Sequence, residues 1–226
     1  MRIIVSEAER QQPGEQDMYL KVIKRLMDIV LAMLGLILLS WVCLIISIAV
    51  FLDDPGPVFF CQKRFGKNKK FFRLHKFRTM KKNAPHEVPT HLLKDPNQYI
   101  TRVGRFLRRS SLDELPQIWD ILVGHMSAVG PRPALWNQDD LIAERDKYGA
   151  NDVRPGLTGL AQINGRDELA IPEKAKLDGE YTTVLKAGGW RAFWMDVKCF
   201  FGSFRPVATA EGVSEGKNVD KSESNE

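Results

Sequence analysis

The residues with the clearest potential for chemistry are two adjacent carboxylates, Asp113 and Glu114, in the segment Arg108–Gln117. Two such groups can divide the work of a phosphoryl-transfer reaction. One can attack phosphorus, as aspartate does when it forms an aspartyl-phosphate. The other can bind Mg²⁺, which takes one or two protein carboxylates together with phosphates of the reacting molecule. The cation would also reduce repulsion between the carboxylates and an anionic substrate.

The same segment also has a purely structural interpretation. Ser111 and Glu114 have the spacing of a capping box, and acidic residues are favoured in a first helical turn. A helix capped at Ser111, however, would place Pro116 beyond that turn, where a backbone hydrogen bond is lost. A cap at Asp113 or Glu114 brings Pro116 into the first turn. The carboxylates would then lie at the mouth of the helix, beside Arg108-Arg109.

Three loops downstream combine glycine, proline and arginine: Gly130–Pro133, Arg154–Gly159 and Asn164–Arg166. Glycine lets backbone N–H groups approach an anion, and arginine offers a planar pair of donors to phosphate. Each loop alone is also typical of an ordinary surface turn. Their succession after an acidic pair indicates a phosphate-binding site.

The element that must place this site is an apolar segment, Ile29–Leu52, which contains no charged residue. At about 1.5 Å per residue it could cross a hydrocarbon core of about 30 Å. Cations flank it on both sides: Lys21, Lys24 and Arg25 before it, and Lys63, Arg64, Lys67, Lys69, Lys70 and Arg73 after it. Because short basic flanks prefer the cytoplasm, the pattern favours a re-entrant helix bent near Gly35 or Ser40. A single spanning helix and a buried helix of a soluble domain are the alternatives.

The remaining pattern predicts an α+β fold that is mainly helical. Two aromatic runs, Val58–Phe65 and Phe71–Met80, surround a Gly/Asn loop and predict a small β-hairpin. Helical patterns cover Val103–Leu107, Leu115–Leu122 and Leu141–Tyr148. The aromatic side chains of Trp190–Phe204 fall on one side of a helix edged with cations, which is typical either of a membrane interface or of a core-facing helix. The membrane segment upstream favours the interface.

Four regions follow from these patterns. Residues 1–18 form a polar N-terminal tail and residues 19–54 a membrane-embedded helix. Residues 55–206 form a catalytic domain on the cytoplasmic side, and residues 207–226 a disordered tail rich in Ser, Glu, Lys and Gly.

Composition narrows the class of partner. The net charge of +5 and the pI of about 9.1 suit nucleic acid, an anionic membrane or a phosphorylated substrate. Three scattered cysteines form no disulfide framework, which indicates a reducing compartment. The four histidines have no metal-ligand spacing, which argues against a zinc site.

Taken in order, the motifs resemble the bacterial sugar transferase family, the monotopic phosphoglycosyl transferases. The resemblance covers residues 19–205 and rests on these segments: Lys24-Arg25 with Asp28, Pro55–Phe60, Lys76–Met80, Ser111–Gln117, Met126–Pro133, Arg154–Gly159, Gln162–Arg166, Leu177-Asp178 with Tyr181, and Asp196–Lys198.

The resemblance implies a specific reaction on a bacterial inner membrane. Asp113 would attack the β-phosphate of a UDP-sugar, release UMP and keep a phosphosugar, which polyprenol (undecaprenyl) phosphate then takes up. Glu114, with Asp113, would bind Mg²⁺. The implied phosphate contacts are Lys76, Arg78, Arg132, Arg154 and Arg166, and further active-site candidates are Thr158, Gln162, Asn164 and Asp178.

Some features depart from the family pattern. Ser40-Trp41 stands where a Ser-Pro break is usual, and Gly179-Glu180 follows Asp178 where apolar residues are usual. The chain resembles a minimal catalytic unit without the N-terminal extension of some relatives, and a homo-oligomer is compatible with it.

Two other functions compete with this one. A single-pass membrane protein with a basic nucleic-acid-binding domain would explain the charge, but no nucleic-acid motif is present, so we expect no nucleic-acid partner. A glycosyltransferase that transfers the sugar alone would release UDP instead of UMP.

Overall fold

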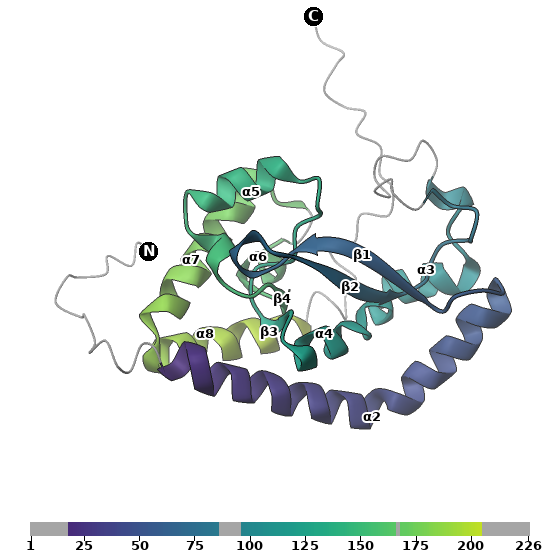
Figure 1. The fold of residues 1–226 in the computed structure, drawn as a ribbon, viewed down its shortest axis with the longest axis horizontal. Helices are drawn as coiled ribbons and strands as arrows, with labels where there is room; N and C mark the ends of the chain where they lie inside the picture. The colour runs from purple at the N-terminus through teal and green to yellow at the C-terminus, as the bar shows by residue number, and fades with distance from the viewer. Residues whose placement is uncertain (1–17, 86–95, 166–167, 205–226) are drawn as a thin grey trace, which may run out of the picture.

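The computed structural model describes residues 18–85, 96–165 and 168–204. Within them the chain is mainly helical, with two small two-stranded sheets (Figure 1). The helices are α2 (Lys24–Asp53), α3 (Arg102–Arg109), α4 (Gln117–Val123), α5 (Asp139–Asp146), α6 (Leu160–Ile163), α7 (Ile171–Ala187) and α8 (Gly189–Gly202). The strands are β1 (Phe59–Phe65), β2 (Phe71–Phe77), β3 (Ser127–Val129) and β4 (Gly156–Thr158). The predicted mainly helical α+β class is confirmed.

The predicted hairpin is present. Strands β1 and β2 are antiparallel, in a register that runs from Phe59 opposite Phe77 to Phe65 opposite Phe71. Strand β2 is shorter than predicted and stops before Arg78. The second sheet was not predicted: β3 and β4 run parallel, and each has only three residues. So short a strand shows no alternating pattern from which a sequence could predict it.

The apolar segment forms one continuous helix, α2, which begins after a wide turn at Tyr19–Ile23. Figure 1 shows α2 bent into a bow along the underside of the molecule. At the two positions where the sequence predicted a bend, the Ser40 hydroxyl donates to the carbonyl of Ile37 at 3.0 Å, and Gly35 packs against Ile118 of α4. Residues 19–53 are long and apolar enough to cross a membrane, and 11% of their most apolar stretch is buried. The re-entrant course stays a prediction.

Both ends of α2 are attached to the same domain. Near its beginning, the Lys24 ammonium lies 2.6 Å from the Asp196 carboxylate of α8, and both side chains are buried. At its end, the Asp53 carboxylate accepts the Val103 N–H of α3 at 2.9 Å. The helix therefore lies along the domain and does not project from it.

The basic flank before α2 has a structural role that its sequence did not indicate. Arg25 donates to the carbonyls of Ile121 and Leu122, each at 2.7 Å, so it binds the end of α4. Lys24 is neutralised by Asp196. Two of the three cations of this N-terminal flank are thus used inside the fold, and the argument from flanking charge is weaker than it appeared from sequence.

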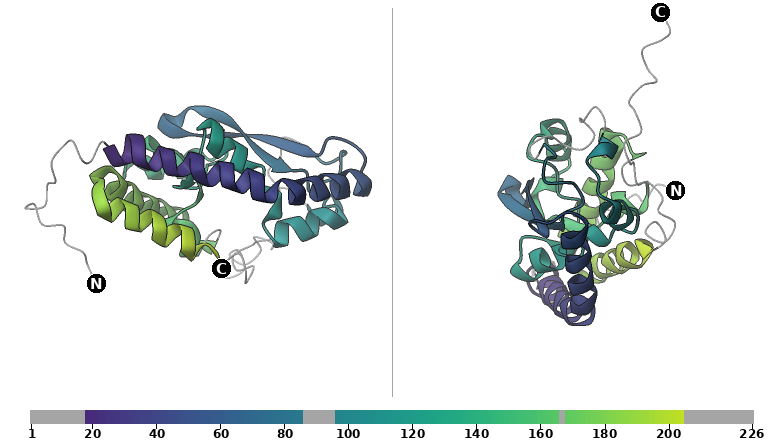
Figure 2. Two further views of the ribbon diagram at one scale, coloured as in Figure 1. Left: turned by 90° about the horizontal axis from the view of Figure 1, so that it is seen from below. Right: turned by 90° about the vertical axis from the view of Figure 1, so that its right-hand side faces the viewer.

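The underside carries a broad apolar surface made by α2 and α8, which lie near each other in Figure 2. Large exposed apolar side chains of α2 include Leu26, Leu31, Leu34, Ile37, Leu38, Trp41, Leu44, Ile45, Ile48 and Leu52. The aromatic side chains of α8 divide into two groups: Trp190, Trp194 and Phe201 are exposed, as is Phe204 just beyond the helix, whereas Phe193 and Phe200 pack against the core. One aromatic side of this segment therefore packs inward, as the core-facing alternative predicts, whereas a membrane-interface role for the exposed side stays a prediction.

Candidate functional site

The adjacent carboxylates lie in a short 3₁₀ turn, Leu112–Glu114, between α3 and α4. Helix α4 begins at Gln117, and Pro116 precedes it as the N-cap, so the proline costs the helix no hydrogen bond. The Ser111 side chain makes no capping bond and its φ is 56°. The capping-box interpretation is therefore wrong. The carboxylates lie just before the helix, one turn earlier than the other interpretation placed them.

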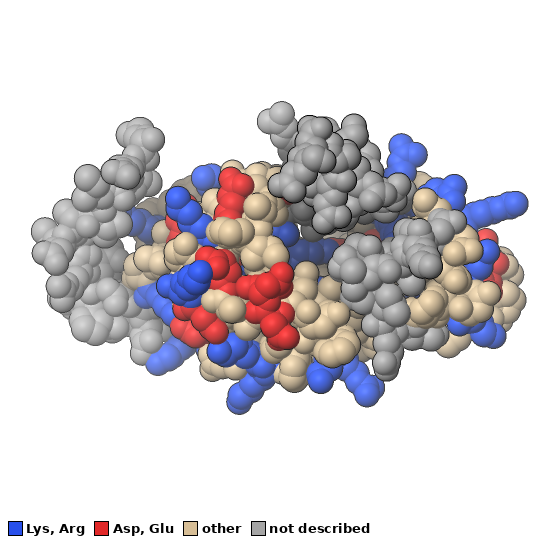
Figure 3. All heavy atoms as spheres, turned by 90° about the horizontal axis from the view of Figure 1, so that it is seen from above, with Lys and Arg blue, Asp and Glu red and all other residues tan. Residues whose placement is uncertain are grey.

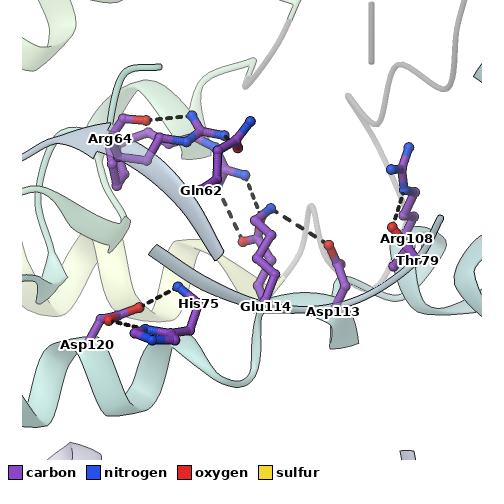
Figure 4. Close-up of polar contacts among 11 residues, drawn as sticks. Gln62, Arg64, His75, Thr79, Arg108, Asp113, Glu114 and Asp120 are labelled. Atoms are coloured by element: carbon purple, nitrogen blue, oxygen red, sulfur yellow. Dashed lines mark hydrogen bonds and ion pairs between the residues drawn. The ribbon is translucent and has the colours of Figure 1, made fainter. Parts of the chain in front are cut away.

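Glu114 is held by two cations (Figure 4). Its Oε1 accepts from Lys76 Nζ at 2.7 Å and from Arg132 Nη2 at 2.5 Å. Burial alone would raise the pKa of Glu114, but Arg132 and Lys76 outweigh burial and hold that pKa far below its usual range. Glu114 is therefore an ionised group with a fixed orientation.

Asp113 has a different environment. Its side chain is 12% exposed, and its Oδ2 lies 3.7 Å from Lys76 Nζ, beyond hydrogen-bond reach. Burial raises the pKa of Asp113, and Glu114 raises it further, while Lys76, Arg108 and Arg132 oppose both effects. Asp113 is thus the less restrained and more basic carboxylate of the pair, which suits a nucleophile.

Two of the five predicted phosphate contacts, Lys76 and Arg132, meet at the carboxylates. Arg78 instead contacts the carbonyl and carboxylate of Asp54, just beyond α2. Arg154 donates from Nε to the carbonyl of Gly124 at 3.1 Å. Arg166 lies outside the described residues. Figure 3, which views the face opposite α2, shows Lys and Arg side chains deep in a central hollow.

Two glycines of the predicted phosphate-binding loops, Gly130 and Gly156, do not offer their amides to an anion as the sequence suggested. Gly130 N–H donates to the carbonyl of Thr158 at 2.8 Å, and Gly156 N–H donates to Pro131 at 2.9 Å. A Cβ on Gly156 would lie 2.0 Å from the backbone N of Gly130. Glycine is required at both positions because the backbones of the β3 and β4 segments approach each other closely. The two glycines therefore serve packing.

Within the part of the chain that the structure describes, no hydrogen bond or ion pair joins the other predicted site residues to the carboxylates. Asp178 is buried in an ion pair with Arg145, and the Asn164 side chain donates to the carbonyl of Leu160 at 2.7 Å. The Thr158 hydroxyl and the Gln162 amide are buried, and neither has a hydrogen-bond partner among the described residues.

Sequence reasoning missed a pair that fixes β2 beside the carboxylates. Asp120 of α4 is fully buried and accepts the backbone N–H of His75 at 2.9 Å, while its other oxygen lies 2.7 Å from His75 Nδ1. His75 directly precedes Lys76 in β2. The bonds between His75 and Asp120 therefore hold the end of β2 that carries Lys76 against α4 (Figure 4). The only sequence signal was a histidine beside Lys76.

Arg108 was noticed beside the carboxylates but not assigned to the site. Its Nε donates to the Thr79 hydroxyl at 2.8 Å, and its charge favours the ionised form of Asp113. This bond directs the guanidinium from α3 towards the segment that follows β2.

The carboxylate pair fits a metal ion only with help from a substrate. Among the described residues, no group of three or more His, Cys, Asp or Glu side chains could hold a metal. Asp113 and Glu114 alone match the way Mg²⁺ is commonly bound, through one or two carboxylates and substrate phosphates.

Comparison with known proteins identifies the family of this chain. The model of a family described as bacterial sugar transferase matches residues 19–210. The UDP-glucose:undecaprenyl-phosphate glucose-1-phosphate transferase of Escherichia coli K12 is 42% identical over 195 residues, which is 80% of this chain and 39% of that protein. The chain thus spans about two fifths of that relative's length.

Shorter relatives are matched over nearly their whole length. EpsL of Bacillus subtilis 168, an uncharacterized sugar transferase, is 37% identical over 88% of this chain and 93% of its own. An exopolysaccharide production protein of Rhizobium leguminosarum is 37% identical over 80% of this chain and 93% of its own. The extent and identity of these matches show that the chain belongs to the bacterial sugar transferase family.

Proposed function

We propose that the protein transfers a sugar 1-phosphate from a UDP-sugar to polyprenol (undecaprenyl) phosphate, giving a polyprenyl-diphosphate sugar and UMP. The observation that carries the proposal is the contrast within the acidic pair. Glu114 is ionised and fixed by Lys76 and Arg132, whereas neighbouring Asp113 is less restrained. The names of several relatives describe sugar-phosphate transfer to undecaprenyl phosphate.

The proposed chemistry has two displacements at one phosphorus atom. An oxygen of Asp113 attacks the β-phosphorus of the UDP-sugar, and the bond to the bridging oxygen breaks, so that UMP leaves with that oxygen. A phosphate oxygen of the polyprenol then attacks the same phosphorus and displaces Asp113. Lys76 and Arg132 lie where they can offset the charge of the phosphates. Arg108 favours the ionised, attacking form of Asp113.

Product analysis tests the proposal. Full-length protein in detergent or nanodiscs, given a UDP-sugar and undecaprenyl phosphate, should release UMP in equal amount to the lipid-linked sugar. Release of UDP would instead indicate transfer of the sugar alone. Salt-sensitive binding of oligonucleotides without UMP release would favour the nucleic-acid alternative.

We also propose a requirement for Mg²⁺, held by Asp113 and Glu114 together with the donor's diphosphate. When bound, the cation would neutralise phosphate charge and polarise the phosphoryl oxygens. EDTA should reduce UMP release to background, and excess Mg²⁺ should restore it. Full turnover in excess chelator would exclude this role. Thermal unfolding with EDTA alone is the control, because a loss of fold would also stop turnover.

The proposed location is the cytoplasmic face of a bacterial inner membrane, with α2 re-entrant. Both ends of α2 are bonded to one domain, at Asp196 and at Val103, so a spanning α2 would have to detach at one end. The apolar underside of α2 and α8 would lie in the membrane.

Labelling of intact cells tests this topology. In a variant without native cysteines, Val5→Cys should react with an impermeant maleimide only after permeabilisation. A cysteine in place of Lys67, on the hairpin, should behave in the same way. Labelling of Val5→Cys from outside, with Lys67→Cys protected, would require a spanning helix instead.

A further inference from the structure

The segment that carries Arg132 is held at every carbonyl. Pro131 and Pro133, on either side of Arg132, have no backbone N–H. The three carbonyl groups of Pro131–Pro133 are therefore most of the backbone groups in this segment that can form hydrogen bonds. The Pro131 carbonyl accepts from the Gly156 N–H at 2.9 Å, and the Pro133 carbonyl accepts from Arg64 Nη1 at 2.9 Å. The backbone around Arg132 is therefore fixed by other elements on both sides.

The carbonyl of Arg132 itself is bound by Arg145 of α5. Arg145 Nη1 donates to it at 3.0 Å. The other side of the same guanidinium, Nε and Nη2, donates to one oxygen of Asp178 in α7, at 2.8 and 2.6 Å. Arg145 is 3% exposed and Asp178 is 1% exposed. A continuous chain of contacts thus runs from α7 through Arg145 to the backbone of the arginine that binds Glu114.

Stability alone does not account for this buried ion pair. Removing two charges from water is energetically costly, and well-packed apolar residues of similar volume often stabilise a fold equally well. Burial also raises the pKa of Asp178, although Arg145 opposes the shift. Among the described residues, no hydrogen bond or ion pair joins Arg145 or Asp178 directly to Asp113 or Glu114. Their connection to it passes through the Arg132 carbonyl.

We propose that Arg145, oriented by Asp178, is a positioning residue that sets the Arg132 guanidinium against Glu114. This inference rests on the proposed function, because it gives Arg132 a part in sugar-phosphate transfer. It assigns a role at the Arg132 backbone to Asp178, which the sequence resemblance named only as an active-site candidate.

The decisive variant removes both buried charges and keeps the volume. Arg145→Met/Asp178→Leu should fold with a Tm close to that of the native protein, because no buried charge is left without a partner. Its kcat/KM for UMP release should nevertheless fall by roughly 10- to 100-fold, since displacement of a catalytic group by about 1 Å can cost that much. Arg145→Lys should show a similar loss, because one ammonium cannot bind Asp178 and the Arg132 carbonyl with the same geometry.

A double-mutant cycle with Arg132→Ala separates positioning from a general structural effect. Once the Arg132 side chain is absent, Arg145→Met/Asp178→Leu should reduce kcat/KM by no more than about 2-fold, because coupled residues are non-additive. Losses that multiply fully in the Arg132→Ala background would overturn the inference, as would native activity of a well-folded Arg145→Met/Asp178→Leu protein.

A matched ion pair supplies the control. Lys186 of the same helix, α7, lies 2.6 Å from Asp152, and both side chains are substantially exposed. Lys186→Gln should leave both Tm and kcat/KM unchanged. If the native protein itself releases no UMP, the proposed function fails and this inference fails with it. UMP release by the native protein together with fully multiplicative losses would refute the inference alone.

Discussion

Asp113→Asn is expected to fold normally and to lose sugar-phosphate transfer by roughly 10⁴-fold or more, the scale seen when a nucleophile is removed. The substitution keeps nearly the same volume and removes the anionic oxygen that would attack phosphorus. With labelled UDP-sugar and no lipid acceptor, native protein should release at most one equivalent of UMP and retain the phosphosugar. The Asp113→Asn protein should retain none, as judged by intact-protein mass spectrometry.

The stability of this variant provides an independent check. Burial raises the pKa of Asp113, so the fold favours its protonated form. A group of this kind stabilises the fold below its unfolded pKa, and that contribution is lost as the pH rises through the folded pKa. At neutral pH the ionised Asp113 side chain therefore adds nothing to the free energy of unfolding through its shifted pKa. Asp113→Asn, measured without metal, should unfold at the native Tm or above it.

Two results would contradict the nucleophile assignment in different ways. Full activity of Asp113→Asn, after mass spectrometry has excluded deamidation to aspartate, would show that Asp113 does not attack. Loss of activity in this variant, with no trappable adduct on the native protein, would favour direct transfer between donor and acceptor, with Asp113 acting as a metal ligand.

The parts of the fold that sequence could predict are those set by local pattern. The hairpin was visible because aromatic runs surround a Gly/Asn loop, and β1 and β2 pair as expected. The carboxylates were placed near a helix start because Pro116 restricts where a helix can begin, and α4 does begin directly after it. Lys76 and Arg132 were selected through the family resemblance, and the structure brings both to Glu114.

What could not be predicted depends on contacts between distant segments. Arg78 was itself predicted to contact phosphate, but its guanidinium is directed to Asp54, just beyond α2. Gly156 in the Arg154–Gly159 loop was expected to expose its amide to an anion. It is instead required because β4 lies too close to the Gly130 backbone for a side chain at this position. A motif records which residue types are required and does not distinguish a ligand contact from a packing contact. The roles of Arg78 and Gly156 follow only from their neighbours.

The course of α2 also depends on contacts between distant segments, but here those contacts support the expectation from sequence. Charge counting predicted that both flanks share one side of the membrane, yet Lys24 and Arg25 are used for internal bonds. The structure supplies a more direct reason for the same expectation, since both ends of the helix are bonded to one domain. The argument for a re-entrant helix now rests on the bonds of Lys24 to Asp196 and of Asp53 to Val103, which the composition of the flanks could not predict.

Glu114→Gln is expected to lose roughly 10²- to 10³-fold in activity, the scale of removing one preorganised electrostatic contact, and also to destabilise the protein. Oε1 of Glu114 lies between Lys76 and Arg132, so a neutral amide would leave two cations close together without the anion that joins them. The lowered pKa of Glu114 gives the sign: its stabilising contribution is present above the unfolded pKa and is lost as the pH falls through the folded pKa.

At neutral pH, without metal, Glu114→Gln should therefore lower Tm, by about 4–8 °C if the lost ionic bonds contribute about 2 kcal/mol. The neighbouring Asp113→Asn, measured in parallel, should not lower it. The two variants remove the same charge one residue apart, so opposite effects on Tm would distinguish a structural anion from a poised nucleophile. Equal destabilisation by both variants would show that the two carboxylates share the ion pairs, and the division of roles between them would have to be abandoned.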